Sequence, residues 1–145
     1  MRILCIDIGD KNIGIAISDE ENLFAKGLGN IQMNENVVDK IKEIIKKYNI
    51  TKIVYGLPLK MDGSFSSQTE KTLSFIAKLK EEIKDMEFIP FDERLTTSLA
   101  ERFLLTADLS RKKRKKYRDK LSAQIILQNY LDSINMKINP EEIEW

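Results

Sequence analysis

The sequence predicts a single α/β domain over residues 1–145 whose sheet combines antiparallel and parallel strands. The length of 145 residues is that of one ordinary domain. Two apolar segments near the N-terminus indicate an antiparallel hairpin, and the later strands alternate with amphipathic helices. Strand–helix–strand units give parallel strands, so the two patterns together predict one mixed sheet with helices on its faces.

The hairpin is predicted from the first two apolar segments. Ile3–Ile6 ends in Asp7-Ile8-Gly9, which indicates a buried strand followed by a polar turn. In Asn12–Ser18 three isoleucines alternate with other residues, which is typical of a second strand. A weaker third strand is expected over Leu23–Leu28, where glycines disturb the pattern.

Helices and strands then alternate along the chain. Glu35–Tyr48 carries apolar residues at helical spacing and predicts an amphipathic helix. Ile53–Tyr55 is a short strand that stops at Gly56-Leu57-Pro58, because proline ends strand pairing. After a polar loop, a second helix is expected over Gln68–Ile83 and a fifth strand over Glu87–Phe91.

The last third of the chain predicts two more helices. Thr96 or Thr97 is a suitable N-cap for a short helix that runs to about Ala107. A basic run follows, and a final helix is expected from about Asp119 to Ile134. The tail after Asn135 is expected to be loosely held.

The composition excludes several kinds of chemistry. The chain has no histidine, which excludes Ser-His-Asp and Cys-His triads, imidazole zinc ligands and a histidine general base. The single cysteine, Cys5, lies in an apolar run and cannot form an intramolecular disulfide. There is no run of about 18 apolar residues, and the N-terminus lacks the features of a signal peptide. We therefore expect a cytoplasmic protein that has no membrane segment.

Three acidic residues lie where the predicted sheet would gather them. Asp7 ends the first strand, Glu93 follows the fifth strand, and Asp119 opens the last helix. Carboxylate oxygens are the ligands that Mg²⁺ prefers, and two such ions can activate water for phosphodiester cleavage. Two alternatives remain: Asp119 is favoured in the first turn of any helix, and Glu93 could form a surface ion pair with a neighbouring arginine.

Positive charge is concentrated in one segment, Arg111–Arg118. It holds seven of the 24 basic residues and no acidic one, so the rest of the chain has 17 basic against 23 acidic residues. Nucleic-acid phosphate is the natural partner of such a run, whereas a solvated charged loop is the alternative. Lys11, in the turn after Asp7, is a further candidate phosphate contact.

Four segments of the sequence resemble the motifs of the YqgF/RuvX family, in the same order. The first runs from Asp7 to Asp19, the second covers Gly56–Ser64 with Gln68 after it, and the third is Asp92–Thr97. The fourth begins at Leu109-Ser110-Arg111-Lys112-Lys113-Arg114 and continues to Asp119, Ala123, Ile126 and Leu127.

The resemblance implies a ribonuclease H-like fold, with a five-stranded sheet of order 3-2-1-4-5 in which strand 2 is antiparallel. It implies a metal-dependent nuclease that processes the 5′ end of the 16S ribosomal RNA precursor and uses Mg²⁺ or Mn²⁺, with two ions. Asp7, Glu93 and Asp119 would be the catalytic residues and metal ligands. The nucleic-acid contacts would be Lys11, Arg94, Arg111, Lys112, Lys113 and Arg114.

Two other functions stay open. The family is also described as a Holliday-junction resolvase, which would act on branched DNA. A non-catalytic RNA-binding assembly factor is the second alternative. For the oligomeric state, we expect a monomer or a weak homodimer. One departure argues against the resolvase analogy: RuvC-like enzymes carry an acid at the end of strand four, where this chain has Gly56-Leu57-Pro58. A minor departure is Ser122, at a place where the family usually has alanine.

Overall fold

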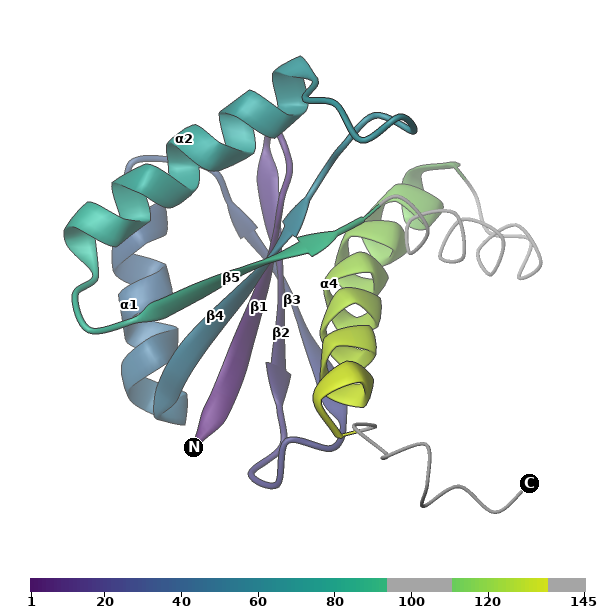
Figure 1. The fold of residues 1–145 in the computed structure, drawn as a ribbon. Helices are drawn as coiled ribbons and strands as arrows, with labels where there is room; N and C mark the ends of the chain where they lie inside the picture. Colours follow the sequence, from purple (N-terminus) through teal and green to yellow (C-terminus); the bar gives the residue numbers. More distant parts are fainter. Residues whose placement is uncertain (94–110, 136–145) are drawn as a thin grey trace, which may run out of the picture.

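A five-stranded sheet forms the centre of the protein (Figure 1). The computed structural model describes residues 1–93 and 111–135, and in the last helix it describes the side chains from Ser122 onward. The strand order is β3-β2-β1-β4-β5, with β2 antiparallel to β1 and β3, and with β1, β4 and β5 parallel. This confirms the predicted sheet. The strands are β1 (Arg2–Ile8), β2 (Asn12–Ser18), β3 (Ala25–Gln32), β4 (Ile50–Leu57) and β5 (Glu87–Asp92).

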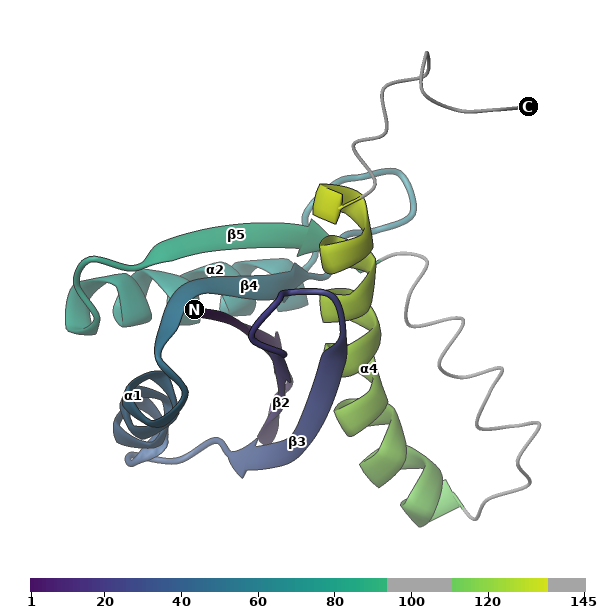
Figure 2. The same ribbon diagram turned by 90° about the horizontal axis from the view of Figure 1, so that it is seen from below.

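Three described helices cover the sheet on both faces. Helices α1 (Val37–Tyr48) and α2 (Ser67–Glu82) lie on one face, and α4 (Arg111–Asn135) lies on the other (Figure 2). The first two helices follow the predicted ranges closely. Within the described part of the chain, none of the helices combines the length and the apolar character that crossing a membrane requires.

The third strand begins and ends later than predicted. The expected range was Leu23–Leu28, whereas β3 is Ala25–Gln32. The carboxylate of Asp19 accepts hydrogen bonds from the backbone N–H groups of Leu23 and Phe24, at 2.7 and 3.1 Å. These bonds keep both residues in the turn, so strand pairing starts after them.

The final helix begins eight residues earlier than predicted. It starts at Arg111 rather than near Asp119, so the basic run, which the prediction placed before the helix, forms its first turns. Lysine and arginine are good helix formers, and a helix that is already packed at one end extends at little cost. The predicted short helix to about Ala107 and the tail after Asn135 lie outside the described residues.

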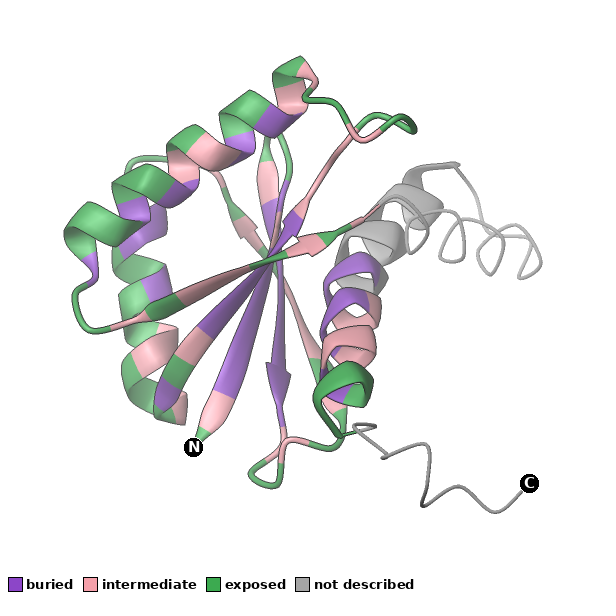
Figure 3. Ribbon diagram, in the orientation of Figure 1, coloured by how far each residue is buried: buried purple, intermediate pink, exposed green. Residues whose placement is uncertain are grey.

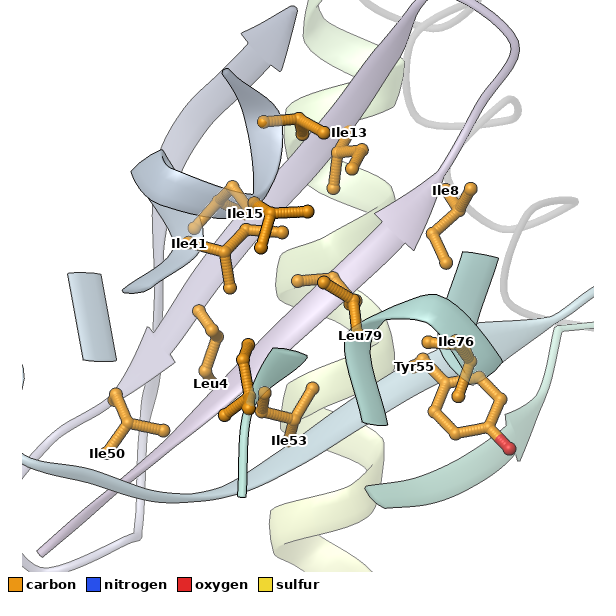
Figure 4. Close-up of a cluster of buried hydrophobic side chains, with 14 of the residues drawn as sticks. Leu4, Ile8, Ile13, Ile15, Ile41, Ile50, Ile53, Tyr55, Ile76 and Leu79 are labelled. Carbon is orange, nitrogen blue, oxygen red and sulfur yellow. The ribbon is translucent and has the colours of Figure 1, made fainter. Parts of the chain in front are cut away.

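The larger of two cores lies between the sheet and helices α1 and α2. Alternate residues of β1, β2 and β4 point to this side and meet the apolar stripes of both helices (Figure 4). Nearly all of these side chains are large and aliphatic, so this face packs as a continuous apolar layer. Its buried members include Leu4, Ile6, Ile8, Ile13, Ile15, Ile17, Ile41, Ile53, Tyr55, Ile76 and Leu79.

The smaller core lies under α4. The sheet contributes mainly small or medium side chains here, and α4 supplies the bulk. Figure 3 shows buried stretches, in purple, on α4 and on the central strands of the sheet. The buried residues of this face are Ile3, Cys5, Ala16 and Val54 from the sheet, and Ala123, Ile126, Leu127 and Leu131 from the helix.

Candidate active site

The predicted carboxylates from β1 and β5 lie at the carboxyl edge of the sheet, on the face that α4 covers. The strands β1, β4 and β5 are parallel, so their carboxyl ends share this edge. Cys5 and Val54 belong to the α4-side core. Side chains alternate along a strand, so Asp7, two residues after Cys5, lies on the same face.

Asp7 and Glu93 interact directly. Their side chains are hydrogen-bonded to each other, and both residues are partly buried. Glu93 comes one residue after β5, and its backbone N–H donates to the carbonyl of Leu57 on β4 at 3.3 Å. The structure thus brings together two of the three predicted acids, from strands that are not neighbours.

The electrostatics of this pair favour a bound cation. Burial raises the pKa of Glu93 to about 10, with further contributions from the hydrogen bond to Asp7, the charge of Asp7 and the charge of Asp92. Burial also raises the pKa of Asp7, partly opposed by the hydrogen bond from Glu93. Two carboxylates this close share one proton at neutral pH unless a cation balances their charge.

The residues present fit a hard divalent cation. Carboxylate oxygens are the preferred ligands of Mg²⁺ and Mn²⁺, and burial, the main cause of both raised pKa values, disfavours the charged pair unless a cation compensates. Among the side chains that the structure describes, those of residues 1–93 and 122–135, no group of three His, Cys, Asp or Glu gathers. The side chain of the third predicted acid, Asp119, is outside that description.

The N-terminal part of α4 nevertheless extends toward the carboxyl edge of the sheet. Near its C-terminal end, Gln128 accepts from the N–H of Ala25 at 2.9 Å, and Asn135 donates to the carbonyl of Asn22 at 2.7 Å. Both contacts lie at the β2–β3 turn, at the opposite edge of the sheet. Position 119 is one helical turn before Ala123, which is buried against the sheet.

Of the residues predicted to contact nucleic acid, the structure describes the side chain of Lys11 only. Lys11 is exposed in the turn between β1 and β2, at the same edge as Asp7. Arg94 lies outside the described residues. Arg111, Lys112, Lys113 and Arg114 form the first turn of α4, and their side chains are outside the description.

The sequence motifs include Gly56, but the strand pattern predicts it after the strand and assigns it no role in the site. It lies inside β4, and a Cβ atom built on it would stand 2.6 Å from Cδ and 2.9 Å from Cγ of Glu93. Glu93 therefore crosses directly over Gly56. Strand alternation offered a signal, because Gly56 follows Val54 by two residues and so shares its face.

The start of α2 also adjoins this edge. Gln68 donates from Nε2 to the carbonyl of Ile8 at 3.4 Å, and Lys71 pairs with Asp10 at 3.6 Å. The helix is capped by Ser66, whose hydroxyl accepts from the N–H of Thr69 at 3.2 Å. These contacts fix α2 against the turn that follows Asp7.

Comparison with protein families gives one match over nearly the whole chain. Residues 1–133 match the model of the RuvX family, described as a Holliday junction resolvase. Among curated proteins, a relative from Caldanaerobacter subterraneus subsp. tengcongensis is 51% identical over 136 residues, covering 92% of this chain and 97% of its own. A relative from Bacillus cytotoxicus is 47% identical over 137 residues, covering 92% of this chain and 99% of its own. Both carry the name "Putative pre-16S rRNA nuclease".

Solved structures of Holliday-junction resolvases share the fold. The RuvC of Thermus thermophilus, in complex with a Holliday junction substrate, superposes with a TM-score of 0.55 at 13% identity, over 94% of this chain and 97% of its own. The fowlpox virus resolvase gives 0.53 at 19% identity, over 92% and 99%. These likenesses confirm the ribonuclease H-like fold that the sequence motifs implied.

Proposed function

We propose a function from the premise that this chain belongs to the RuvX family, whose model matches residues 1–133. The protein is a divalent-metal-dependent nuclease that processes the 5′ end of the 16S ribosomal RNA precursor. The names of relatives about half identical to this chain support the substrate. The observation that carries the chemistry is the contact between Asp7 and Glu93, two partly buried carboxyl groups whose side chains are hydrogen-bonded to each other.

Each acid has a distinct place in the proposed site. Asp7, Glu93 and Asp119 would hold a divalent metal, Mg²⁺ or Mn²⁺, with two ions in the full site. Such ions would supply activation of the attacking water and stabilisation of the leaving oxygen. Asp7 and Glu93 present their oxygens from the sheet, and Asp119 supplies a third carboxylate from α4. For both carboxylates to hold a cation in their charged form, Glu93 would release its proton to solvent.

Basic residues around this edge hold the RNA backbone. Lys11 approaches from the turn after β1, and Arg94 follows Glu93 directly in the chain. Arg111, Lys112, Lys113 and Arg114 open α4, whose later turns pack on the face that carries Asp7. Phosphate contacts of this kind position the strand and make its affinity salt-dependent.

A Holliday-junction resolvase is the second candidate, favoured by the family description and the shared fold with RuvC. Symmetric cleavage of a four-way junction requires two sites related by a two-fold axis. In the RuvC pattern an acid ends strand four, whereas this chain has Gly56 there and brings Glu93 from β5. Competition between precursor RNA and a four-way DNA junction separates the two candidates, and preferential cleavage of the junction by a dimer would favour the resolvase.

The decisive experiment measures cleavage of a 16S precursor RNA with Mg²⁺ or Mn²⁺ and with a chelator. We expect metal-dependent shortening of the 5′ end by the wild type and none by Asp7→Asn. Asp10→Asn is the matched control, because Asp10 is an exposed neighbour paired only with Lys71 in the described contacts. Equal turnover by Asp7→Asn would exclude the assigned site. Tight RNA binding without cleavage in any metal would instead favour the assembly factor.

A further inference from the structure

Gly56 lies between the two interacting acids, Asp7 and Glu93, on the strand that separates them. Strand β4 lies between β1, which carries Asp7, and β5, which precedes Glu93. The register pairs Ile6 with Tyr55 and Gly56 with Phe91, so Gly56 stands beside Asp7 on one side and beside the end of β5 on the other. Neighbouring strands are about 4.8 Å apart, so a contact from β5 to β1 must pass over β4.

The space above Gly56 is filled by Glu93. The nearest atoms to a Cβ built on Gly56 all belong to the Glu93 side chain, with Cδ at 2.6 Å and Cγ at 2.9 Å. Real Cβ atoms do not approach other atoms this closely, so any side chain at position 56 would displace Glu93.

Backbone conformation does not explain this glycine. Gly56 is not among the residues with positive φ, so a left-handed backbone is not the reason for glycine here. Gly29 shows the opposite case, because it has open space around it but a φ of 113°. At position 56, then, glycine is needed for its missing side chain.

We propose that Gly56 is a positioning residue of the candidate site, since only a bare position on β4 lets the Glu93 carboxylate reach Asp7. This inference rests on the proposed function for its catalytic consequence. The backbone of Glu93 is held to β4 through the carbonyl of Leu57. A side chain at position 56 would therefore turn the carboxylate away from Asp7 without moving the strand.

The first experiment is a double-mutant cycle on RNA cleavage with Gly56→Ala, Glu93→Gln and the double variant. We expect Gly56→Ala to lower kcat by about 100-fold with little change in KM, because a small misplacement of a catalytic group has an effect of this size. The double variant should be no slower than Glu93→Gln, because Gly56→Ala acts only by displacing the carboxylate that Glu93→Gln removes. An unchanged kcat in Gly56→Ala, or losses that multiply in the double variant, would overturn the inference.

A second cycle follows Mn²⁺ binding by calorimetry and needs no cleavage. Gly56→Ala should weaken binding by about 10- to 100-fold, the effect usual for a residue that orients a metal ligand. In a Glu93→Ala background the same substitution should have no effect. If the wild type binds Mn²⁺ but cleaves neither RNA nor a junction, the proposed function fails, and this cycle still decides the role of Gly56.

Relocating the carboxylate gives the sharpest control. In Gly56→Asp with Glu93→Ala, the new carboxyl group starts from a Cβ that lies 2.6 Å from the present position of the Glu93 Cδ. It should restore Mn²⁺ binding above the level of Glu93→Ala, whereas Gly56→Asn with Glu93→Ala should not. Equal binding by these two double variants would overturn the inference. If Gly56→Ala alone does not fold but Gly56→Ala with Glu93→Ala does, the steric conflict is confirmed directly.

Discussion

The two faces of the sheet use alternate residues of the same strands, yet they change differently along their length. On the face that packs against α1 and α2, β1 stays apolar through Leu4, Ile6 and Ile8. On the α4 face the same strand passes from Ile3 and Cys5 to Asp7. One face is thus apolar up to the carboxyl edge, whereas the other exchanges apolar packing for carboxylates there.

This difference shows how one sheet can separate stability from chemistry. Burying aliphatic side chains contributes to folding, whereas burying two adjacent carboxylates opposes it. Because strand alternation keeps the two sets on opposite sides, the unfavourable pair does not interrupt the larger core. A substitution on one face should therefore affect mainly activity, and a substitution on the other mainly the free energy of unfolding.

The largest expected effect is on activity, at Asp7. Asp7→Asn should lower cleavage by about 10³-fold or more, because several kcal/mol of transition-state stabilisation depend on the loaded site. The same variant should unfold at a higher temperature than the wild type in chelator, because a charge next to Glu93 is removed. Thermal unfolding and single-turnover cleavage measure both. A melting temperature below that of the wild type would contradict the separation of the two faces.

The reciprocal change lies on the opposite face, at Ile41 of α1. Ile41 is fully buried, so Ile41→Ala should lower the free energy of unfolding by about 2–5 kcal/mol. Urea unfolding measures the loss. Cleavage per folded molecule should stay at the wild-type value below the unfolding transition, and a loss like that of Asp7→Asn would show that the faces are coupled.

Neutralising the start of α4 extends the comparison to RNA binding. Replacing Lys112, Lys113 and Arg114 with glutamine should weaken RNA binding. It should also reduce the slope of log affinity against log salt concentration by about 2. Fluorescence anisotropy at several salt concentrations measures the slope. The triple variant Lys40→Gln, Lys42→Gln, Lys46→Gln on α1 is the matched control, and an equal change of slope there would place the RNA elsewhere.

The carboxylate pair should make stability depend on pH. The folded pKa of Glu93 is raised to about 10 from an ordinary value of 4.5. Between these values the folded protein holds a proton that the unfolded chain has released, so the free energy of unfolding should fall as pH rises from about 5 to about 9. Urea unfolding in chelator, compared with Glu93→Gln, measures this. A difference between the two proteins that does not vary with pH would contradict the shared proton.

The smallest effects are expected from two buried hydroxyl groups. Among the described residues, Thr72 on α2 has a buried hydroxyl with no hydrogen-bond partner, so Thr72→Val should raise the free energy of unfolding by about 1 kcal/mol. Ser18 is the contrasting case, because its hydroxyl accepts from the N–H of Ile3 at 2.7 Å and donates to Asn22 at 2.6 Å. Ser18→Ala should cost about 1–3 kcal/mol. Thermal unfolding compares the two, and equal signs would contradict this account.

Much of the fold followed from local pattern and family motifs. Alternation and helical spacing gave β1, β2, α1 and α2 nearly at their observed bounds, and the motifs gave the strand order. The start of β3 depends on the side chain of Asp19. Farther along, β3 contains a bulge where its pairing with β2 shifts register, next to Gly29, whose φ is 113°. Neither feature has a period that a sequence pattern would show.

The candidate site was predictable in its residue types but not in its geometry. Asp7 and Glu93 were identified from their places after strands, and the structure brings them together. The role of Gly56 depends on the register of three strands and on a side chain that crosses one of them, which are long-range facts. The distance of Asp119 from the carboxyl edge of the sheet depends likewise on how α4 packs, and sequence spacing does not contain that information.

The buried thiol next to Asp7 has a consequence for the character of the α4 face. Burial raises the pKa of Cys5 well above its ordinary value, with the charges of Asp7 and Glu93 contributing. A neutral thiol behaves as a small apolar group, whereas a thiolate is a nucleophile and a soft metal ligand. Cys5 therefore belongs to the core under α4, and the acidic part of this face begins only at Asp7.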